Sequence, residues 1–271
     1  MSFRFKKIAA VGALIGAIAL AGCDQKEKDP NHIKVGVIVG AEQQVAEAAQ
    51  KVAKDKYGLD VELVTFNDYV LPNEALSKGD IDVNAFQHKP YLDQQIKDRG
   101  YKLVSVGNSF VYPIAGYSKK IKSLDELQDG AQIAIPNDPT NLGRTLLLLQ
   151  KVGLIKLKEG TGLLPTVLDI TENPKHLKIV ELEAPQLPRS LDDQQIALAV
   201  INTTYASQIG LTPAKDGIFV EDKDSPYVNL IVAREDNKDA ENVKKFVQAY
   251  QSDEVNEAAN KVFNGGAVKG W

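Results

Sequence analysis

Ring-bearing side chains crowd one short stretch of this sequence, where Phe86, His88 and Tyr91 fall within six positions. They follow an alternating apolar segment at 81–85, which predicts a β-strand, and they precede a helical pattern. Open α/β sheets bind ligands beyond the carboxyl ends of their strands. We therefore predict that this strand end and Tyr69 border a cleft for a small molecule with an apolar tail. Plain core packing is the alternative for any single one of these rings.

A set of polar side chains could bind the other end of such a molecule. Arg144 lies near the start of a predicted helix, where backbone N–H groups and the helix dipole favour an anion. Its planar guanidinium can clamp a carboxylate with two hydrogen bonds. Asn141, Asn202 and Asn229 carry amides that both donate and accept, which suits a zwitterion. Taken alone, Arg144 is more simply explained as a surface arginine paired with an acid. For the asparagines, turn or cap formation is as good an explanation as ligand binding.

Catalytic and metal-binding patterns are largely missing from the sequence. His32, His88 and His176 are far apart and have no metal-spaced neighbours, and neither a Gly-x-Ser-x-Gly elbow nor a phosphate-binding loop occurs. We predict a binding protein with no metal and no cofactor. A periplasmic hydrolase or lyase with His88 as general base is the alternative, and it would need Asp80 or Asp82 to orient the ring.

The first 32 residues predict export and membrane anchoring. A basic start is followed by an apolar run at 8–20, shorter than the roughly 20 residues of a membrane span. The run ends in Leu20-Ala21-Gly22-Cys23, which resembles the lipobox of bacterial lipoproteins. We therefore predict a signal peptide over 1–22, lipidation of Cys23 and a flexible tether over 23–32. Asp24 resembles the inner-membrane retention signal of enteric lipoproteins. An ordinary signal peptide with a chance cysteine is the alternative.

Size and charge narrow the class of protein further. The signal peptide carries three cations and no acid, so 29 of the 32 basic residues remain against 36 acidic ones, and the net charge becomes about −7. No basic block occurs, so we expect no nucleic-acid partner. The remaining length is near the size at which one hydrophobic core gives way to two.

Alternating strand and helix patterns predict an α/β fold with parallel, doubly wound sheets. Strands at 33–39, 61–66 and 103–106 alternate with helices in the first part. The second part predicts strands at 133–135, 166–170, 179–182 and 196–201, with Ser123, Asp138 and Asn202 as helix starts.

Two extended runs, 110–117 and 227–232, indicate that the chain crosses between two lobes twice. We predict one lobe over 33–111 and 227–271, a second over 112–226, and a two-stranded hinge between them.

Several motifs together resemble the NlpA family of bacterial lipoproteins. They are the lipobox, Val35-Gly36-Val37, and the segments 84–91, 136–144 and 227–229. The resemblance implies a two-lobed, type II-like periplasmic-binding-protein fold. It also implies a substrate-binding protein, monomeric as a domain, that delivers D- and L-methionine to an ABC importer with membrane permease and ATPase subunits, the permease being contacted directly.

The resemblance also implies roles for individual residues, and it reverses the preference stated above for Arg144. By family likeness, Arg144 takes the ligand carboxylate. The side-chain pocket and the head-group contacts then come from Tyr69, Phe86, His88, Tyr91, Asn141, Asn202 and Asn229. Tyr112 belongs either to the pocket or only to the hinge. Another small amino acid or a methionine-containing dipeptide remains open as the ligand.

Overall fold

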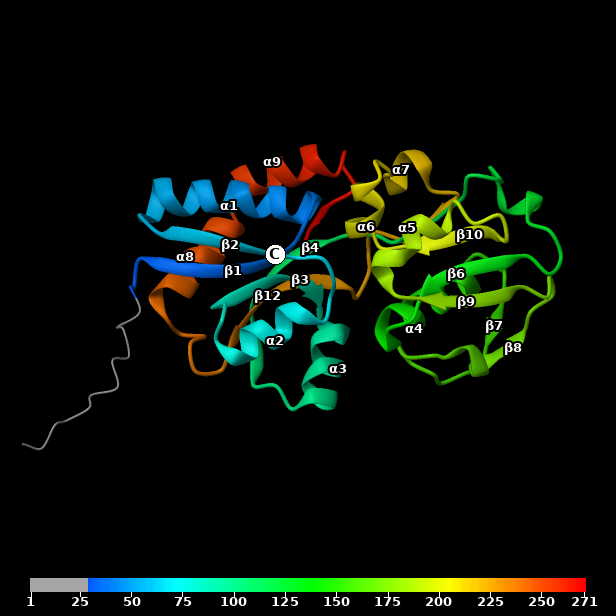
Figure 1. Ribbon diagram of the computed structural model, residues 1–271, viewed down its shortest axis with the longest axis horizontal. Coiled ribbons are helices and arrows are strands. Elements are labelled where there is room, and N and C mark those ends of the chain that lie inside the picture. The colour runs from blue at the N-terminus through cyan, green and yellow to red at the C-terminus, as the bar shows by residue number, and fades with distance from the viewer. Residues whose placement is uncertain (1–28) are drawn as a thin grey trace, which may run out of the picture.

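The computed structural model describes residues 29–271, and these residues form two α/β lobes joined by two crossings of the chain (Figure 1). The predicted signal peptide, Cys23 and most of the predicted tether lie outside the described residues. The predicted two-lobed fold is confirmed. The lobe boundaries at 111/112 and 226/227 stay a prediction.

The first lobe is built on a six-stranded sheet with the order β13-β4-β12-β3-β1-β2. β1 pairs in parallel with both β2 and β3, whereas β12 runs antiparallel between β3 and β4. The strands are β1 (His32–Ile38), β2 (Asp60–Phe66), β3 (Val83–His88), β4 (Leu103–Val111), β12 (Val228–Arg234) and β13 (Val268–Lys269).

The antiparallel strand β12 departs from the parallel sheet that the alternating pattern predicts. β4 leads the chain out of the first lobe, and β12 brings it back. A returning chain enters the sheet at the end where β4 leaves, so it must run in the opposite direction. Local patterns do not report this reversal, because it depends on where the second lobe sits.

The second lobe contains a five-stranded sheet with the order β11-β5-β10-β6-β9. β10, β6 and β9 are parallel, and β5 is antiparallel to both of its neighbours. Its strands are β5 (Ala115–Tyr117), β6 (Gln132–Pro136), β9 (Lys178–Leu182), β10 (Ile196–Ile201) and β11 (Phe219–Val220), with a separate hairpin of β7 (Lys156–Leu157) and β8 (Ile170–Glu172).

Helices cover the sheets, and three of them end at a glycine in the left-handed conformation. α1 (Ala41–Tyr57), α2 (Leu71–Lys78) and α3 (Lys89–Arg99) each end at a left-handed glycine. The others are α4 (Pro139–Lys151), α5 (Leu187–Ser190), α6 (Thr203–Gln208), α7 (Pro213–Asp216), α8 (Glu241–Tyr250) and α9 (Asp253–Val262), with 3-10 turns at Leu124–Glu126, Val167–Asp169 and Ala184–Gln186.

Three local predictions differ from the structure. Residues 167–169 form a 3-10 turn rather than most of a strand, because Thr166 and Asp169 close a reciprocal capping box there. Ser123 and Asn202 precede helical turns as predicted, but neither side chain caps its helix. Asn202 is instead used in a hydrogen bond to Asn141.

Each lobe has its own core, and a further cluster joins the lobes. In the first lobe, α1, α8 and α9 pack their apolar faces on one side of the sheet, and residues of α2 and α3 pack on the other. The second lobe buries the apolar face of α4 against β6 and β10. The joining cluster contains Ile38, Phe86 and Tyr91 from the first lobe and Tyr205 from the second. The lobes are therefore in contact across an apolar as well as a polar interface.

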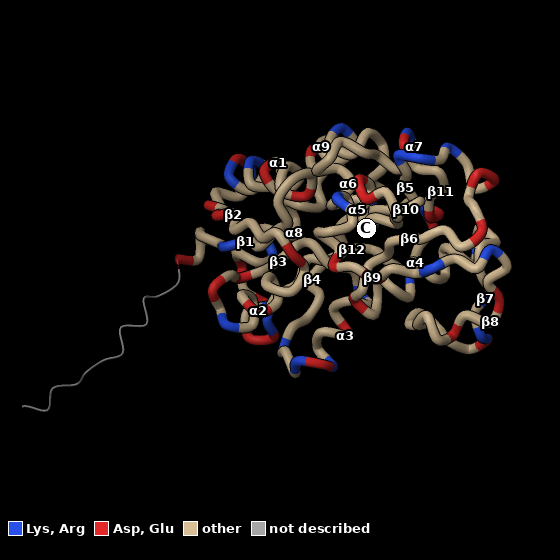
Figure 2. Tube along the Cα trace, turned by 45° about the vertical axis from the view of Figure 1, so that its right-hand side comes forward, with Lys and Arg blue, Asp and Glu red and all other residues tan. Residues whose placement is uncertain are grey.

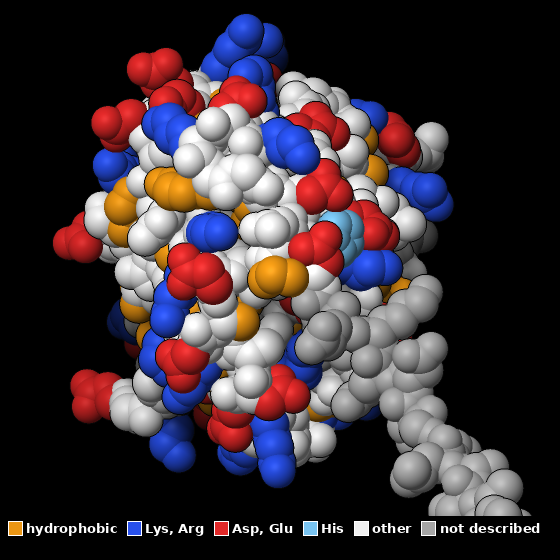
Figure 3. Space-filling model, turned by 90° about the vertical axis from the view of Figure 1, so that its left-hand side faces the viewer, with side chains coloured by type: hydrophobic (Ala, Val, Ile, Leu, Met, Phe, Trp, Pro, Cys, Tyr) orange, Lys and Arg blue, Asp and Glu red, His pale blue; other side chains and the backbone are white. Residues whose placement is uncertain are grey.

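Charges of both signs are mixed over the surface. Lys and Arg alternate with Asp and Glu around the outline in Figure 2 and over the end of the first lobe in Figure 3. Exposed pairs such as Lys51 with Asp55 and Lys89 with Asp93 are spaced one helical turn apart. Among residues 29–271, the helices are all too short or too polar to span a bilayer.

The start of α4 requires a glycine, and this can be tested by Gly143→Ala. A β-carbon on Gly143 would collide with the carbonyl oxygen of Leu163 and lie 3.0 Å from the α-carbon of Leu164. Such overpacking costs about 1–3 kcal/mol, whereas helix propensity alone would favour Ala by about 1 kcal/mol. We expect urea denaturation to show a lower free energy of unfolding. Lys151→Ala at the exposed end of α4 serves as the control, and a Gly143→Ala variant as stable as the parent would contradict the assignment.

Candidate ligand-binding site

A cavity lies at the junction of the two lobes, with an empty volume of about 350 Å³. All eight residues that the sequence predicts for the site line this cavity, together with four others. The lining consists of Tyr69, Phe86, Gln87, His88, Tyr91, Tyr112, Asn141, Arg144, Asn202, Thr203, Thr204 and Asn229.

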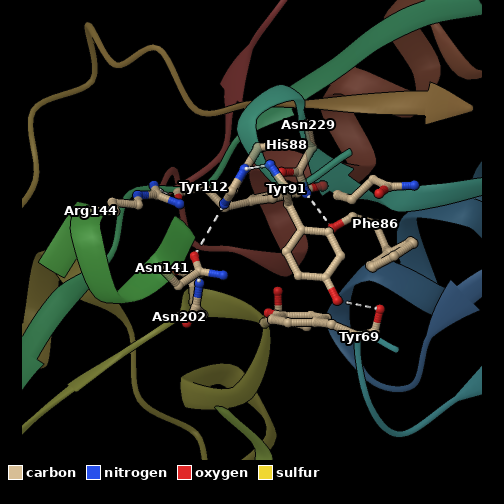
Figure 4. A pocket seen from close by; sticks show the side chains of 12 residues that line it. Tyr69, Phe86, His88, Tyr91, Tyr112, Asn141, Arg144, Asn202 and Asn229 are labelled. Atoms are coloured by element: carbon tan, nitrogen blue, oxygen red, sulfur yellow. Dashed lines mark hydrogen bonds between the residues drawn. The ribbon is translucent and has the colours of Figure 1, made fainter. Parts of the chain in front are cut away.

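One end of the cavity is aromatic (Figure 4). Phe86 lies at the carboxyl end of β3, Tyr91 in the first turn of α3, and Tyr69 in the loop before α2. The Tyr69 and Phe86 rings are stacked with centroids 5.8 Å apart, and the Tyr91 ring meets both at 6.1 Å. The Tyr91 hydroxyl donates to the Tyr69 carbonyl at 2.8 Å, so the phenol is satisfied outside the cavity and its ring is held in place.

The opposite end is polar, and its geometry starts from Asp138 at the N-cap of α4. The Asp138 carboxylate accepts from the Asn141 backbone N–H at 3.0 Å and from its side-chain Nδ2 at 2.9 Å. The side chain of Asn141 is therefore oriented with Oδ1 away from Asp138. That oxygen contacts His88 at 3.2 Å and accepts from Asn202 Nδ2 at 2.9 Å.

These contacts define the tautomer of His88. Its Nδ1 accepts the Tyr91 backbone N–H at 3.2 Å, so the ring proton belongs on Nε2, where it is donated to Asn141 Oδ1. Burial first, and the nearby Arg144 guanidinium second, lower the pKa of His88 from 6.5 to about 3. His88 is thus a neutral hydrogen-bond donor, with its ring edge against Tyr91 and Tyr227.

Arg144 lies in the second turn of α4 and is almost fully buried. Its Nε donates to Glu221 Oε1 at 2.9 Å, and Nη2 donates to Glu221 Oε2 and to the Tyr112 carbonyl. The guanidinium also lies 4.5 Å from the centre of the Tyr227 ring. These contacts join the arginine to both crossings of the chain.

The partner of Arg144 changes one detail of the sequence-based picture. The Nε–Nη2 edge, which could clamp a ligand carboxylate with two parallel bonds, is occupied by Glu221. Nη1 has no hydrogen bond to any described residue, so this nitrogen is the part of the fork available to the cavity. The pair also has no net charge, which limits the cost of burying the guanidinium.

Two asparagines complete the polar lining with acceptor oxygens. Asn202 donates a hydrogen bond from Nδ2 to Asn141 Oδ1. Its own buried Oδ1 has no hydrogen-bond partner among the described residues. Asn229 in β12 lies opposite His88 in the strand register and donates Nδ2 to the Phe86 carbonyl at 2.9 Å. Its Oδ1 is consequently its remaining acceptor. A buried acceptor without a partner, such as Asn202 Oδ1, is uncommon, and it suits a donor such as an ammonium group.

The sequence did not single out Gln87, Thr203 and Thr204. The two threonines follow Asn202 directly at the same strand-to-helix junction, and this position was the signal that could have found them. Gln87 alternates with Phe86 and His88 along β3, and it belongs to a buried amide cluster with Asn73 and Asn84. Tyr112 lines the cavity as well as following the last residue of β4.

The alternative catalytic arrangement has no support in the geometry. Both ring nitrogens of His88 are engaged by Tyr91 and Asn141 rather than by Asp80 or Asp82. A histidine with a pKa near 3 is also too weak a base to remove a proton efficiently at neutral pH. Within residues 29–271, no three His, Cys, Asp or Glu side chains are grouped as metal ligands.

Comparison with known proteins bears on this site. The family model described as NlpA lipoprotein matches residues 33–271. The chain is 90% identical over 271 residues to "D-methionine-binding lipoprotein MetQ" of Escherichia coli strain K12, with all of both chains covered.

Solved structures agree with this relationship. A crystal structure of "the Methionine Binding Protein, MetQ" matches with a TM-score of 0.89 at 92% identity, covering 90% of this chain and 99% of that one. A nutrient-binding protein from Burkholderia cenocepacia bound to methionine matches with a TM-score of 0.86 at 55% identity, covering 88% and 100%.

The state of His88 can be tested by nitrogen-15 NMR of histidine-labelled protein. We expect the Nε2-protonated neutral ring from pH 5 to pH 8, because the pKa lies near 3. The unfolded ring takes up a proton below its ordinary pKa of 6.5 and the folded ring does not, so this residue lowers the free energy of unfolding as the pH falls from about 6.5 to about 3. The His88→Gln spectrum identifies the resonances. A charged ring at pH 6 would refute the assignment.

Proposed function

Because the chain belongs to the NlpA lipoprotein family, we propose that it is the substrate-binding protein of an ABC importer and that it captures methionine. The observation that carries this proposal is the division of one small cavity into an aromatic end and a polar end (Figure 4). A free amino acid with an apolar side chain has the same division. Both enantiomers are included, since the name of the relative specifies D-methionine and the family resemblance implies both.

The electrostatics of the cavity suit a zwitterion. Arg144 is paired with Glu221, and His88 is neutral. A ligand with one positive and one negative group adds no net charge to this buried site, so it avoids the cost of an unpaired buried ion. A ligand with only one of the two groups would carry that cost.

The hydrogen-bonding groups suggest how the head group is oriented. Arg144 Nη1 is the donor for the carboxylate. The oxygens Asn202 Oδ1 and Asn229 Oδ1 are the acceptors for the ammonium. These acceptors come from different lobes, and each is held by the hydrogen bond that its own amide nitrogen donates.

The aromatic end suits a thioether. Sulfur–ring contacts contribute about 0.3–1.5 kcal/mol each, and the rings of Tyr69, Phe86 and Tyr91 contact one another and line the cavity. Apolar burial of the side chain adds about 25 cal/mol for each Å² removed from water. Neither effect depends on the configuration at the α-carbon, which is compatible with binding of both enantiomers.

We infer that the lobes comprise 33–111 with 227–271, and 112–226, and that they hinge at the two crossings. In a closed state, contacts such as His88 with Asn141 join the lobes around the ligand. Binding would shift an open–closed equilibrium by the differential affinity for the closed state. The relatives are named as binding proteins, and this role requires no catalytic group.

The location of the protein follows from the predicted anchor. Lipidation at Cys23 would tether the domain to the periplasmic face of the inner membrane, where it would contact the permease of the importer directly. Several acyl chains, at about 0.8 kcal/mol per buried methylene, suffice for stable anchoring. The tether lets the folded domain reach a transporter in the same membrane.

Native mass spectrometry of the chain, purified without added ligand, tests the identity of the ligand. We expect a complex with the mass of one methionine, because the closed cavity would retain it. The mass of another amino acid or of a methionine-containing dipeptide would redirect the proposal to that ligand, and would count against methionine.

Calorimetry with L- and D-methionine tests the site residues. Arg144→Ala removes the carboxylate donor and Asn229→Ala removes an ammonium acceptor, and hydrogen bonds to charged groups contribute about 1.5–3 kcal/mol each. We expect each variant to lose at least about tenfold in affinity, with Arg144→Ala losing most. Arg189→Ala, an exposed arginine of the second lobe, is the control. Circular dichroism verifies folding, and unchanged affinity in both site variants would remove the assignment.

A further inference from the structure

A buried acid lies directly behind the cavity. Glu42, in the first turn of α1, is 1% exposed. Its Oε1 accepts a short hydrogen bond from the Thr204 hydroxyl, and its Oε2 has no hydrogen-bond partner among the described residues. No salt bridge to Glu42 occurs in the described part of the chain. The carboxyl group therefore depends on one neutral hydroxyl from the other lobe.

Thr204 connects Glu42 to the ligand site. It belongs to α6, which follows β10 of the second lobe, and it lines the cavity. The same helix makes two further contacts with the first lobe: Gln208 Nε2 donates to the Val39 carbonyl at 3.0 Å, and the Tyr205 hydroxyl to the Asn67 carbonyl at 3.3 Å. α6 is thus the element of the second lobe that covers Glu42.

Among residues 29–271, no cation contributes to the electrostatics of Glu42. The titratable groups that interact with it are tyrosines from four different segments: Tyr69 of the loop before α2, Tyr112 after β4, Tyr205 of α6 and Tyr250 of α8. Burial raises the pKa of each phenol, so all four are neutral at physiological pH. The N-terminus of α1 favours the ionised acid, but this effect is small beside the cost of burying an unpaired charge.

We propose that Glu42 and Thr204 form a latch between the lobes, which closes over bound methionine with uptake of one proton by Glu42. Glu42 is then a positioning residue that holds Thr204, and with it α6, at the cavity. This inference rests on the proposed function, because it concerns closure around the same ligand.

The proton balance follows from the two positions of α6. When the lobes separate, α6 leaves with the second lobe, and the Glu42 carboxyl faces water and ionises. When the lobes close, the Glu42 carboxylate takes up one proton from the solvent and accepts a hydrogen bond from the Thr204 hydroxyl. Burial raises the pKa of Glu42 from 4.5 to about 8 in the closed arrangement, against the opposing effect of the Thr204 hydrogen bond.

The sign of the pH dependence follows from the two pKa values of Glu42, 4.5 in the open state and about 8 in the closed state. Below about pH 4.5 both states hold the proton, and closure is not penalised. Between about pH 4.5 and pH 8 only the closed state holds it, so methionine affinity falls as the pH rises, by at most tenfold per pH unit. Above about pH 8 the dependence ends.

Calorimetry of the full chain with L-methionine, in two buffers of different ionisation enthalpy at pH 7, measures the protons taken up on binding. We expect uptake approaching one proton and a dissociation constant that rises between pH 5 and pH 8. Glu42→Gln keeps an oxygen for Thr204 but cannot titrate, so tight binding should persist without proton uptake or pH slope. Glu47→Gln, on the exposed face of the same helix, should behave like the parent.

The outcomes separate the two proposals. Methionine binding without proton uptake, or an unchanged pH slope in Glu42→Gln, overturns the latch and leaves the binding function intact. Failure of the parent chain to bind methionine at any pH overturns the proposed function, and the coupling with it. Loss of proton uptake only in Glu42→Gln supports the latch.

Discussion

At the start of α4, the carboxylate of Asp138 accepts hydrogen bonds from both the backbone N–H and the side-chain amide of Asn141. This leaves Asn141 with a carbonyl oxygen facing the cavity, and that oxygen requires donors. His88 must therefore carry its proton on Nε2, and Asn202 must turn its amide nitrogen inward. The directions of Asn141, His88 and Asn202 follow from this single helix cap. Because the contacts of Asn141 with His88 and Asn202 are buried, a reversal there would leave unpaired groups.

Arg144 imposes a second constraint, since a buried guanidinium must be paired. Glu221 supplies the charge and the Tyr112 carbonyl supplies a further acceptor. Glu221 directly follows β11 and Tyr112 directly follows β4, so both partners lie where the chain passes between the lobes. Arg144 is consequently held by segments next to both crossings of the chain, and one hydrogen-bond network joins the cavity to these crossings. The same pairing balances the charge of the guanidinium, as the proposed zwitterionic ligand requires.

The topology explains why a pocket exists at this place. β3 and β4 both point their carboxyl ends towards the second lobe, and β12 returns between them in the opposite direction. The return places Asn229 beside His88, although 141 positions separate them in the sequence. From the other lobe, the ends of β6 and β10 lead into α4 and α6, which contribute Asn141, Arg144 and Thr204. The site is complete only when both lobes meet.

The sequence by itself determined the features that depend on neighbouring residues. The aromatic strand end at 86–91, the helix start at Asp138 and the division into two lobes could all be read from local patterns, and the family motifs pointed to eight of the twelve residues that line the cavity. Tertiary structure alone decided the antiparallel entry of β12, the pairing of Arg144 with Glu221 across 77 positions, and the burial of Glu42 beneath Thr204. Local periodicity specifies which face of an element is apolar. It does not specify which distant segment will cover that face, and the covering segment determines the charge, hydrogen-bond direction and pKa of a buried group.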